Sequence, residues 1–310
     1  DKVLLNSEFK MVSRLIFSVV FVFCFIFLAR TSGLDAKGDR ESVSLTGQWL
    51  AAATIFEIKI KNAVRFLNNN KMYLGPQSNT TKGTHPLIIF WGRHHNFTTH
   101  FSWDYPLPPL TATDIQEVVA CVSHVRVEGI PDQLFYSCFK LLLDSSEEGS
   151  FLDPYMGALG GKFMWSYPTE VFSMDWKPYP SLDLTEKDVS IPLHYTSERF
   201  SIKLTRKGRW TKYDNISNQE SLKSSILPEI LAQPIVSPFI LNSSTLLCSY
   251  LDALGQNPSF AVGEAEIDFL DDTLVPKDAK LLETTFLYSD WKVHAPFYCP
   301  REQPKKQDMQ

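Results

Sequence analysis

An apolar run over residues 15–29 constrains this chain more than any other feature. Arg14 precedes the run, and Arg30 follows it, with small residues at Thr31 and Gly33, three and one before a cut after Gly33. This succession is typical of a secretory signal peptide over residues 11–33, with residues 1–10 as a leader that is not native protein. The run is shorter than the roughly 20 apolar residues that cross a bilayer, although an uncleaved anchor is the alternative. We therefore expect export to the extracellular space or the secretory-pathway lumen, with no stable membrane span after cleavage.

The balance of charge argues against a nucleic-acid partner. The chain carries 30 basic and 35 acidic residues, a formal net charge of −5. Cleavage after Gly33 removes four basic and two acidic residues, which makes the remainder more acidic. Nucleic-acid binding depends on clustered Lys and Arg side chains that neutralise phosphates. We expect residues 34–300 to form one domain with a sizeable core, and the polar tail 301–310 to be disordered.

Four cysteines remain once Cys24 is lost with the signal peptide: Cys121, Cys138, Cys248 and Cys299. An even number in an oxidising compartment predicts two disulfides, with buried free thiols as the alternative. Among the three connectivities we favour Cys121–Cys138, which closes a short loop between neighbouring strands, together with Cys248–Cys299. No pair has the C-x-x-C spacing of a zinc ribbon or a redox site.

Four N-x-S/T sequons offer glycan acceptors in an exported chain, at Asn79, Asn96, Asn215 and Asn242. Asn79 and Asn215 lie in polar, turn-rich stretches and are the stronger candidates. On a strand, His94 and His100 would share a face but lie too far apart to bind one metal ion. We therefore predict no metal site.

Residues Ser44 to Leu67 are predicted to form an N-terminal amphipathic helix. Its apolar residues recur at steps of three or four: Trp49, Ala53, Phe56, Ile60, Val64 and Leu67. We expect this face to pack on the core rather than on a membrane surface, which is the alternative for a helix with basic residues opposite.

Strand patterns dominate from Pro86 onward. Apolar runs or apolar–polar alternation cover residues 87–91, 97–103, 134–143, 200–204, 261–269 and 282–293. Helical signals are few: a capping box from Thr113 to Gln116, and a short helix within 221–233 broken by Pro228. The predicted fold class is α+β, mostly antiparallel β, with a barrel-like or sandwich sheet.

A glycine-rich and aromatic stretch over residues 151–176 resembles the signature region of the acetoacetate decarboxylase-like superfamily. The residues that carry the resemblance are Asp153, Gly160, Gly161, Lys162, Trp165, Tyr167 and Pro168. The stretches 263–266 and 271–274 are similar to the family's late strand and closing turn. The resemblance extends loosely over residues 105–295 and implies one acetoacetate decarboxylase-like domain.

The departure from the family pattern bears directly on chemistry. The resemblance implies two lysines directly after Pro168, of which the first forms a Schiff base with a keto acid and the second lowers its pKa. Here these positions hold Thr169 and Glu170. Threonine has no amine, so an imine cannot form there, and the glutamate reverses the local charge. The decarboxylase chemistry is therefore predicted to be lost, and no cofactor is expected.

These features together predict a non-catalytic, secreted glycoprotein that binds a small apolar or acidic ligand. Such ligands bind in mostly apolar cavities with a few polar groups. The candidate lining residues are Lys162, Trp165, Tyr167, Thr169 and Glu170. One alternative is a divergent lyase or hydrolase that uses Glu170 as an acid or base. A structural or interaction protein is the other.

Overall fold

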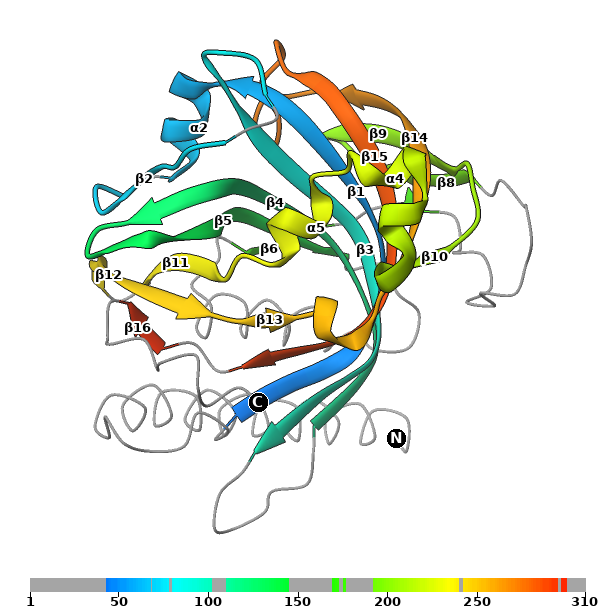
Figure 1. Ribbon diagram of the computed structural model, residues 1–310, viewed down its shortest axis with the longest axis horizontal. Coiled ribbons are helices and arrows are strands. Elements are labelled where there is room, and N and C mark those ends of the chain that lie inside the picture. The colour runs from blue at the N-terminus through cyan, green and yellow to red at the C-terminus, as the bar shows by residue number, and fades with distance from the viewer. Residues whose placement is uncertain are drawn as a thin grey trace, which may run out of the picture. The chain divides into compact units, whose positions relative to one another are not determined.

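Strands make up most of the chain that the structure describes (Figure 1). This computed structural model describes residues 43–67, 69–77, 80–101, 110–144, 169–172, 175–176, 192–239, 242–294 and 297–299. All of them belong to the unit Arg40–Gln310. The predicted leader, signal peptide and C-terminal tail lie outside the described residues.

The strands are β1 (Val43–Lys59), β2 (Met72–Leu74), β3 (Thr84–Phe101), β4 (Leu110–Val127), β5 (Ile130–Asp144), β6 (Thr169–Phe172), β7 (Asp175–Trp176), β8 (Pro192–Thr196), β9 (Phe200–Arg206), β10 (Thr211–Lys212), β11 (Ile235–Phe239), β12 (Asn242–Ser249), β13 (Leu251–Asp252), β14 (Ser259–Phe269), β15 (Lys280–His294) and β16 (Phe297–Cys299). The helices are α2 (Ile60–Leu67), α4 (Glu220–Lys223) and α5 (Leu227–Leu231), with the 3₁₀ turns η1 (Tyr213–Asn218) and η2 (Leu254–Gln256).

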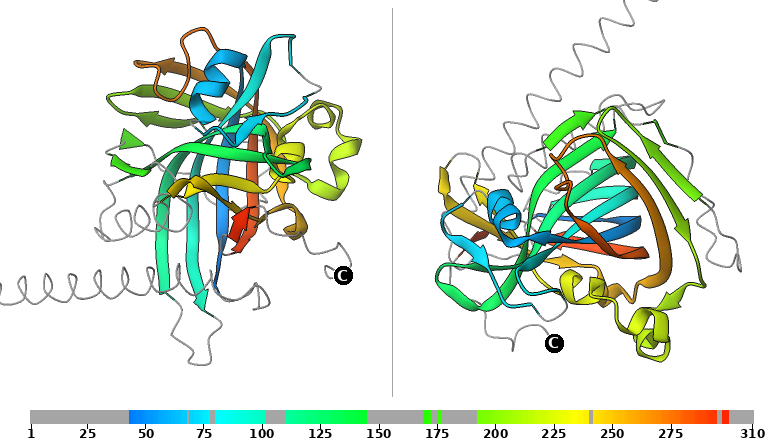
Figure 2. Two further views of the ribbon diagram at one scale, coloured as in Figure 1. Left: turned by 90° about the vertical axis from the view of Figure 1, so that its left-hand side faces the viewer. Right: turned by 90° about the horizontal axis from the view of Figure 1, so that it is seen from above.

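One sheet joins the strands in the order β16-β12-β11-β5-β4-β3-β1-β15-β14-β9-β8-β7. Strands β2, β6, β10 and β13 pair at its side. The described pairings are antiparallel except for two, since both β11 and β6 run parallel to β5. The sheet curls strongly but its described pairing does not close into a barrel (Figure 2). The prediction of a mostly antiparallel α+β fold is thus confirmed.

The predicted helix from Ser44 to Leu67 is wrong over most of its length, because β1 occupies residues 43–59. Only α2 is helical there, and two residues of its supposed buried face, Ile60 and Val64, are 44% and 54% exposed. Strand β1 lies between β3 and β15, and every residue from 49 to 58 is buried. A strand that is buried on both faces carries apolar residues at nearly every position, so it also satisfies the spacing of a helix.

The remaining predictions of helices and strands were confirmed in part. The predicted capping box is wrong, because Gln116 pairs with Arg93 in the middle of the β3–β4 ladder. The short helix within 221–233 is present as two pieces, α4 and α5, but the predicted break at Pro228 is wrong, because the break falls at residues 224–226. Pro228 lies in the first turn of α5, where its missing N–H costs nothing. All six predicted strand segments fall within or largely within β3, β5, β9, β14 and β15. None of the helices in the described ranges is long and apolar enough to cross a membrane.

Two layers of side chains cover the two sides of the long strands. On one side, the inner face, Ala52, Trp91 and Leu142 pack with residues of β8 and β9, because the curled sheet brings those strands across from β3 (Figure 2). On the other side, the outer face, Ala51 and Phe90 pack with α4 and α5. The chain therefore has two cores that share the same central strands.

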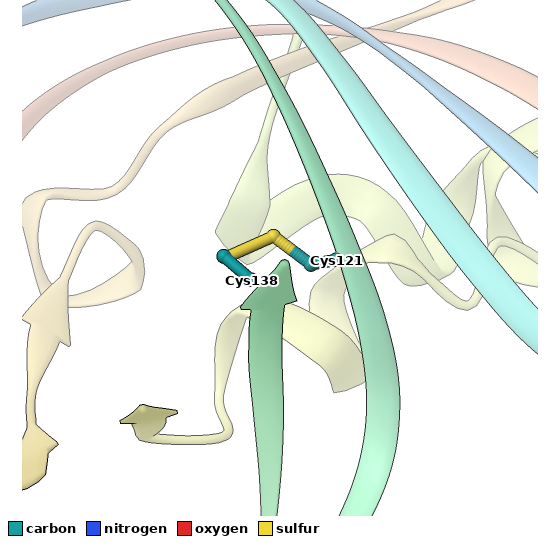
Figure 3. Close-up of a disulfide and its surroundings, with 2 residues drawn as sticks. All are labelled: Cys121 and Cys138. Carbon is teal, nitrogen blue, oxygen red and sulfur yellow. A yellow bond between two sulfur atoms is a disulfide. The ribbon is translucent and has the colours of Figure 1, made fainter. Parts of the chain in front are cut away.

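The structure joins Cys121 to Cys138 and Cys248 to Cys299, which is the connectivity favoured from the sequence. Cys121 and Cys138 are directly paired residues of β4 and β5 (Figure 3). Cys248 of β12 and Cys299 of β16 lie on neighbouring strands as well. Each link therefore connects strands that already share backbone hydrogen bonds.

A buried histidine pair lies where β4 bulges. His85 is 1% exposed, and its Nε2 donates a hydrogen bond to the Ser123 carbonyl oxygen (2.7 Å). His124 has a positive φ of 52°, and its Nε2 donates to Glu229 Oε1 of α5 (2.8 Å). Its backbone N–H donates to Gln233 (3.0 Å). Together these bonds hold α5 against the outer face.

Burial lowers the pKa of His85 to about 4 from 6.5, although the bond to Ser123 works in the opposite direction. The unfolded chain then binds the His85 proton more tightly, so folding stability should fall as the pH drops from 6.5 to 4. A shift of this size corresponds to about 3 kcal/mol. We expect urea unfolding of His85→Gln to lose much of this pH dependence. The same substitution at half-buried His194 should retain it, and equal behaviour of the two variants would contradict the assignment.

Candidate functional site

Thr169 and Glu170, which stand where the family resemblance expects two lysines, both lie in strand β6. The orientation of this strand determines which of them faces the core. It runs parallel to β5, with Thr169 beside Leu141 and Glu170 beside Leu142. Successive side chains of a strand point to opposite faces. Leu142 belongs to the inner face, so Glu170 lies on that face and Thr169 on the other. The two side chains therefore point to opposite faces of the strand.

Glu170 is the last member of a row of aligned residues that crosses four strand pairs. The register aligns Ala52 of β1 with Trp91, Trp91 with Val118, Val118 with Leu142, and Leu142 with Glu170. The other four side chains are fully buried on the inner face. A carboxylate at the end of an apolar row needs partners for its charge, because desolvation without them is costly.

Two cations supply these partners. Lys140 Nζ donates to Glu170 Oε1, and Arg199 Nη1 donates to Glu170 Oε2 (2.7 Å). Lys140 lies two residues before Leu142 on β5 and thus on the same face. Arg199 lies in the turn between β8 and β9, where Ser197 Oγ accepts its backbone N–H (3.1 Å). The curl of the sheet brings these three side chains together.

The charges in this cluster hold Glu170 as an anion. Burial alone raises the pKa of Glu170, but the hydrogen bonds and charges of Lys140 and Arg199 outweigh burial and lower it. The two cations are 17% and 25% exposed, whereas the carboxylate is 41% exposed. Glu170 is therefore the member of the cluster that lies nearest to water.

An aromatic group adjoins the cluster on the inner face. Phe200, next to Arg199 in the chain, meets the ring of Trp91 edge-on with centroids 5.1 Å apart. Tyr195 lies 6.0 Å from the same ring. Trp91 Nε1 donates to Thr54 Oγ1 (3.0 Å), so the indole is fixed by a hydrogen bond as well as by packing. The polar cluster thus borders a rigid apolar layer.

Of the five residues that sequence reasoning proposed for ligand binding, Lys162, Trp165 and Tyr167 lie outside the described residues. Lys140 and Arg199 were missed. Lys140 is a single charge within an apolar run, which is a usable signal for a buried partner. Arg199 stands in an ordinary polar turn and gives no such signal.

The structure also places the other predicted sites. Asn215 is exposed on η1, Asn79 lies outside the described residues, and Asn96 and Asn242 belong to β3 and β12. His94 stacks on Trp49 and donates to Glu117 Oε1 (2.7 Å) on the outer face. In the described part of the chain, no three His, Cys, Asp or Glu side chains are grouped to hold a metal ion.

Comparison with known proteins identifies the fold. No family model and no curated protein matches the sequence. Among solved structures, an acetoacetate decarboxylase-like enzyme from Sphingomonas wittichii RW1 matches with a TM-score of 0.51 and 12% identity, over 83% of this chain and 93% of that one. The enduracididine biosynthesis enzyme MppR complexed with pyruvate matches with a TM-score of 0.52 and 10% identity, over 86% and 93%. The fold is therefore acetoacetate decarboxylase-like.

The pKa of Glu170 should depend on both Lys140 and Arg199. Lys140→Met or Arg199→Met should raise that pKa, because each removes one hydrogen bond and one positive charge. With both removed, burial acts alone and the pKa should exceed the ordinary value of 4.5. Carbon-13 NMR titration of the Glu170 carboxyl measures it. Lys203→Met, which removes the partner of Glu266, is the control and should leave the pKa of Glu170 unchanged.

Proposed function

We propose that this protein is a secreted, disulfide-bonded glycoprotein whose acetoacetate decarboxylase-like fold binds a small apolar or acidic ligand without forming an imine. The observation that carries the proposal is the state of Glu170, which is held between Lys140 and Arg199. The family resemblance expects at this position the second lysine, which lowers the pKa of the Schiff-base lysine beside it. The group at this position is an anion in an ion-pair cluster, not a cation that would lower the pKa of a neighbouring amine.

Neither residue at the lysine positions can begin imine chemistry. Imine formation requires a neutral amine that attacks the carbonyl carbon of a substrate. Thr169 has no amine, and Glu170 is a carboxylate. Lys140 lies beside them, but its nitrogen is engaged in a hydrogen bond to Glu170.

The alternative is an enzyme with altered chemistry. The two similar solved structures favour this alternative, since both proteins are enzymes. Glu170 is the residue that such an enzyme would use. Its pKa is lowered by the two cations, so at neutral pH it could accept a proton but not supply one. A lyase or hydrolase here would therefore use Glu170 as a base. The MppR complex with pyruvate supports a small acidic molecule as ligand under either function.

Several features support export. The apolar run over 15–29 has the flanks of a signal peptide. The pairs Cys121–Cys138 and Cys248–Cys299 are suited to an oxidising compartment. Asn215 is an exposed sequon, as a glycan acceptor must be.

The absence of imine chemistry can be tested directly. The full-length protein mixed with acetoacetate and borohydride should show no decarboxylation above background and no alkylated lysine in peptide maps. Borohydride traps any imine, so the readout does not depend on turnover. A modified lysine that disappeared in Lys140→Met would show that the nucleophile had moved to β5 and would refute the proposal.

Export and glycosylation have a separate test. Protein secreted from eukaryotic cells should begin at Leu34, and enzymatic removal of N-glycans should lower its mass. Asn215→Gln should abolish one glycan, whereas Asn218→Gln, on the same turn but outside any sequon, should abolish none. A secreted product that retains residues 11–33 would contradict signal cleavage.

A further inference from the structure

We propose that Lys140 and Arg199 form a binding site for the carboxylate of a small monoanionic ligand, and that Glu170 occupies this site until the ligand displaces it. This inference rests on the proposed function, namely that the fold binds a small molecule. It goes further by naming the chemical class of the ligand, the two residues that bind it, and an internal competitor.

The geometry of the three side chains is that of a bound carboxylate. Lys140 binds one oxygen of Glu170 and Arg199 binds the other. Arg and Lys are the side chains that bind carboxylates most strongly, through charge-assisted hydrogen bonds. A ligand carboxylate in the same place would make the same two bonds.

The two cations are positioned by elements other than Glu170. Lys140 lies in β5, which pairs along much of its length with β4. Arg199 lies in the turn where Ser197 Oγ accepts the backbone N–H groups of both Arg199 and Phe200, each at 3.1 Å. Backbone pairing and turn geometry do not depend on the Glu170 side chain. The backbone positions of both residues should therefore be retained when Glu170 departs, so that an arriving carboxylate can take its place between the two cations.

Glu170 is the member of the cluster that can leave. At 41% exposure it is nearer to water than Lys140 or Arg199, so its carboxylate loses little solvation during exchange. The departing carboxylate and the arriving one carry the same charge, so Lys140 and Arg199 have one carboxylate partner before and after the exchange.

The same reasoning selects a monocarboxylate with a short apolar body. A dianion such as phosphate would bring a second negative charge close to the displaced Glu170. The neighbours on the inner face are apolar, with Leu142 beside Glu170 and Phe200 beside Arg199. Ligand sites of this kind combine a few polar groups with an apolar wall. Butyrate is therefore a suitable probe, and inorganic phosphate is the contrasting anion.

The test is calorimetric titration of butyrate into the full-length protein and its variants. Glu170→Gln removes the competitor and keeps the shape of the side chain, so butyrate should bind about ten-fold more tightly than to the unaltered protein. Adding Arg199→Gln to this variant should abolish the gain. Glu266→Gln, which frees Lys203 from a matched but exposed ion pair, is the control and should change nothing. Phosphate should gain less than butyrate in Glu170→Gln.

A second measurement keeps the test independent of how the variants fold. In the unaltered protein, butyrate should shift the NMR signals of the Arg199 guanidinium group, and Arg206 should not respond. Equal butyrate affinity in the unaltered protein and Glu170→Gln, or no shift at Arg199, would overturn the inference. So would an equal gain for phosphate, since the site would then select no carboxylate. Failure of the butyrate experiments would not affect the borohydride test of the proposed function. Conversely, a lysine trapped by borohydride would contradict the proposed function without contradicting carboxylate binding at Lys140 and Arg199.

Discussion

The burial of β1 on both of its faces is the constraint on which the rest of the structure depends. Alternate residues of this one strand supply the inner and the outer core, with Ala52 on one side and Ala51 on the other. A shift of β3 by one residue would exchange the two layers and place the bond between Trp91 and Thr54 on the wrong side. The register at β1 therefore determines the aligned row that ends at Glu170.

The same constraint explains which elements could be predicted from the sequence. The strand β14 alternates between half-buried and exposed side chains from Gly263 to Phe269, and this leaves a period of two that is easy to recognise. β1 has no polar face, so its apolar residues match a helix equally well. The supposed capping box at Thr113 failed because local sequence cannot anticipate pairing with β3.

The candidate site was predictable only in part, for a related reason. Glu170 was identified because a family pattern marks its position, whereas its strand neighbour Thr169 points to the opposite face. Lys140 and Arg199 lie 30 and 29 residues away from Glu170, on opposite sides of it in the chain. They meet because β6 joins β5 while the sheet curls to bring β9 across. Spacing in the sequence contains no information about such a curl.

The link between Cys121 and Cys138 has a mechanical consequence for the two strands that it joins. These residues are 17 apart in the sequence, so the closed loop is short and restricts the unfolded chain less than a long loop would. Its larger effect is on sliding, since a covalent bond between paired residues prevents β5 from slipping along β4 even when their hydrogen bonds open. Lys140 lies two residues beyond Cys138. The disulfide therefore also limits how far the backbone at Lys140 can move along β4 when the hydrogen bonds between the two strands open.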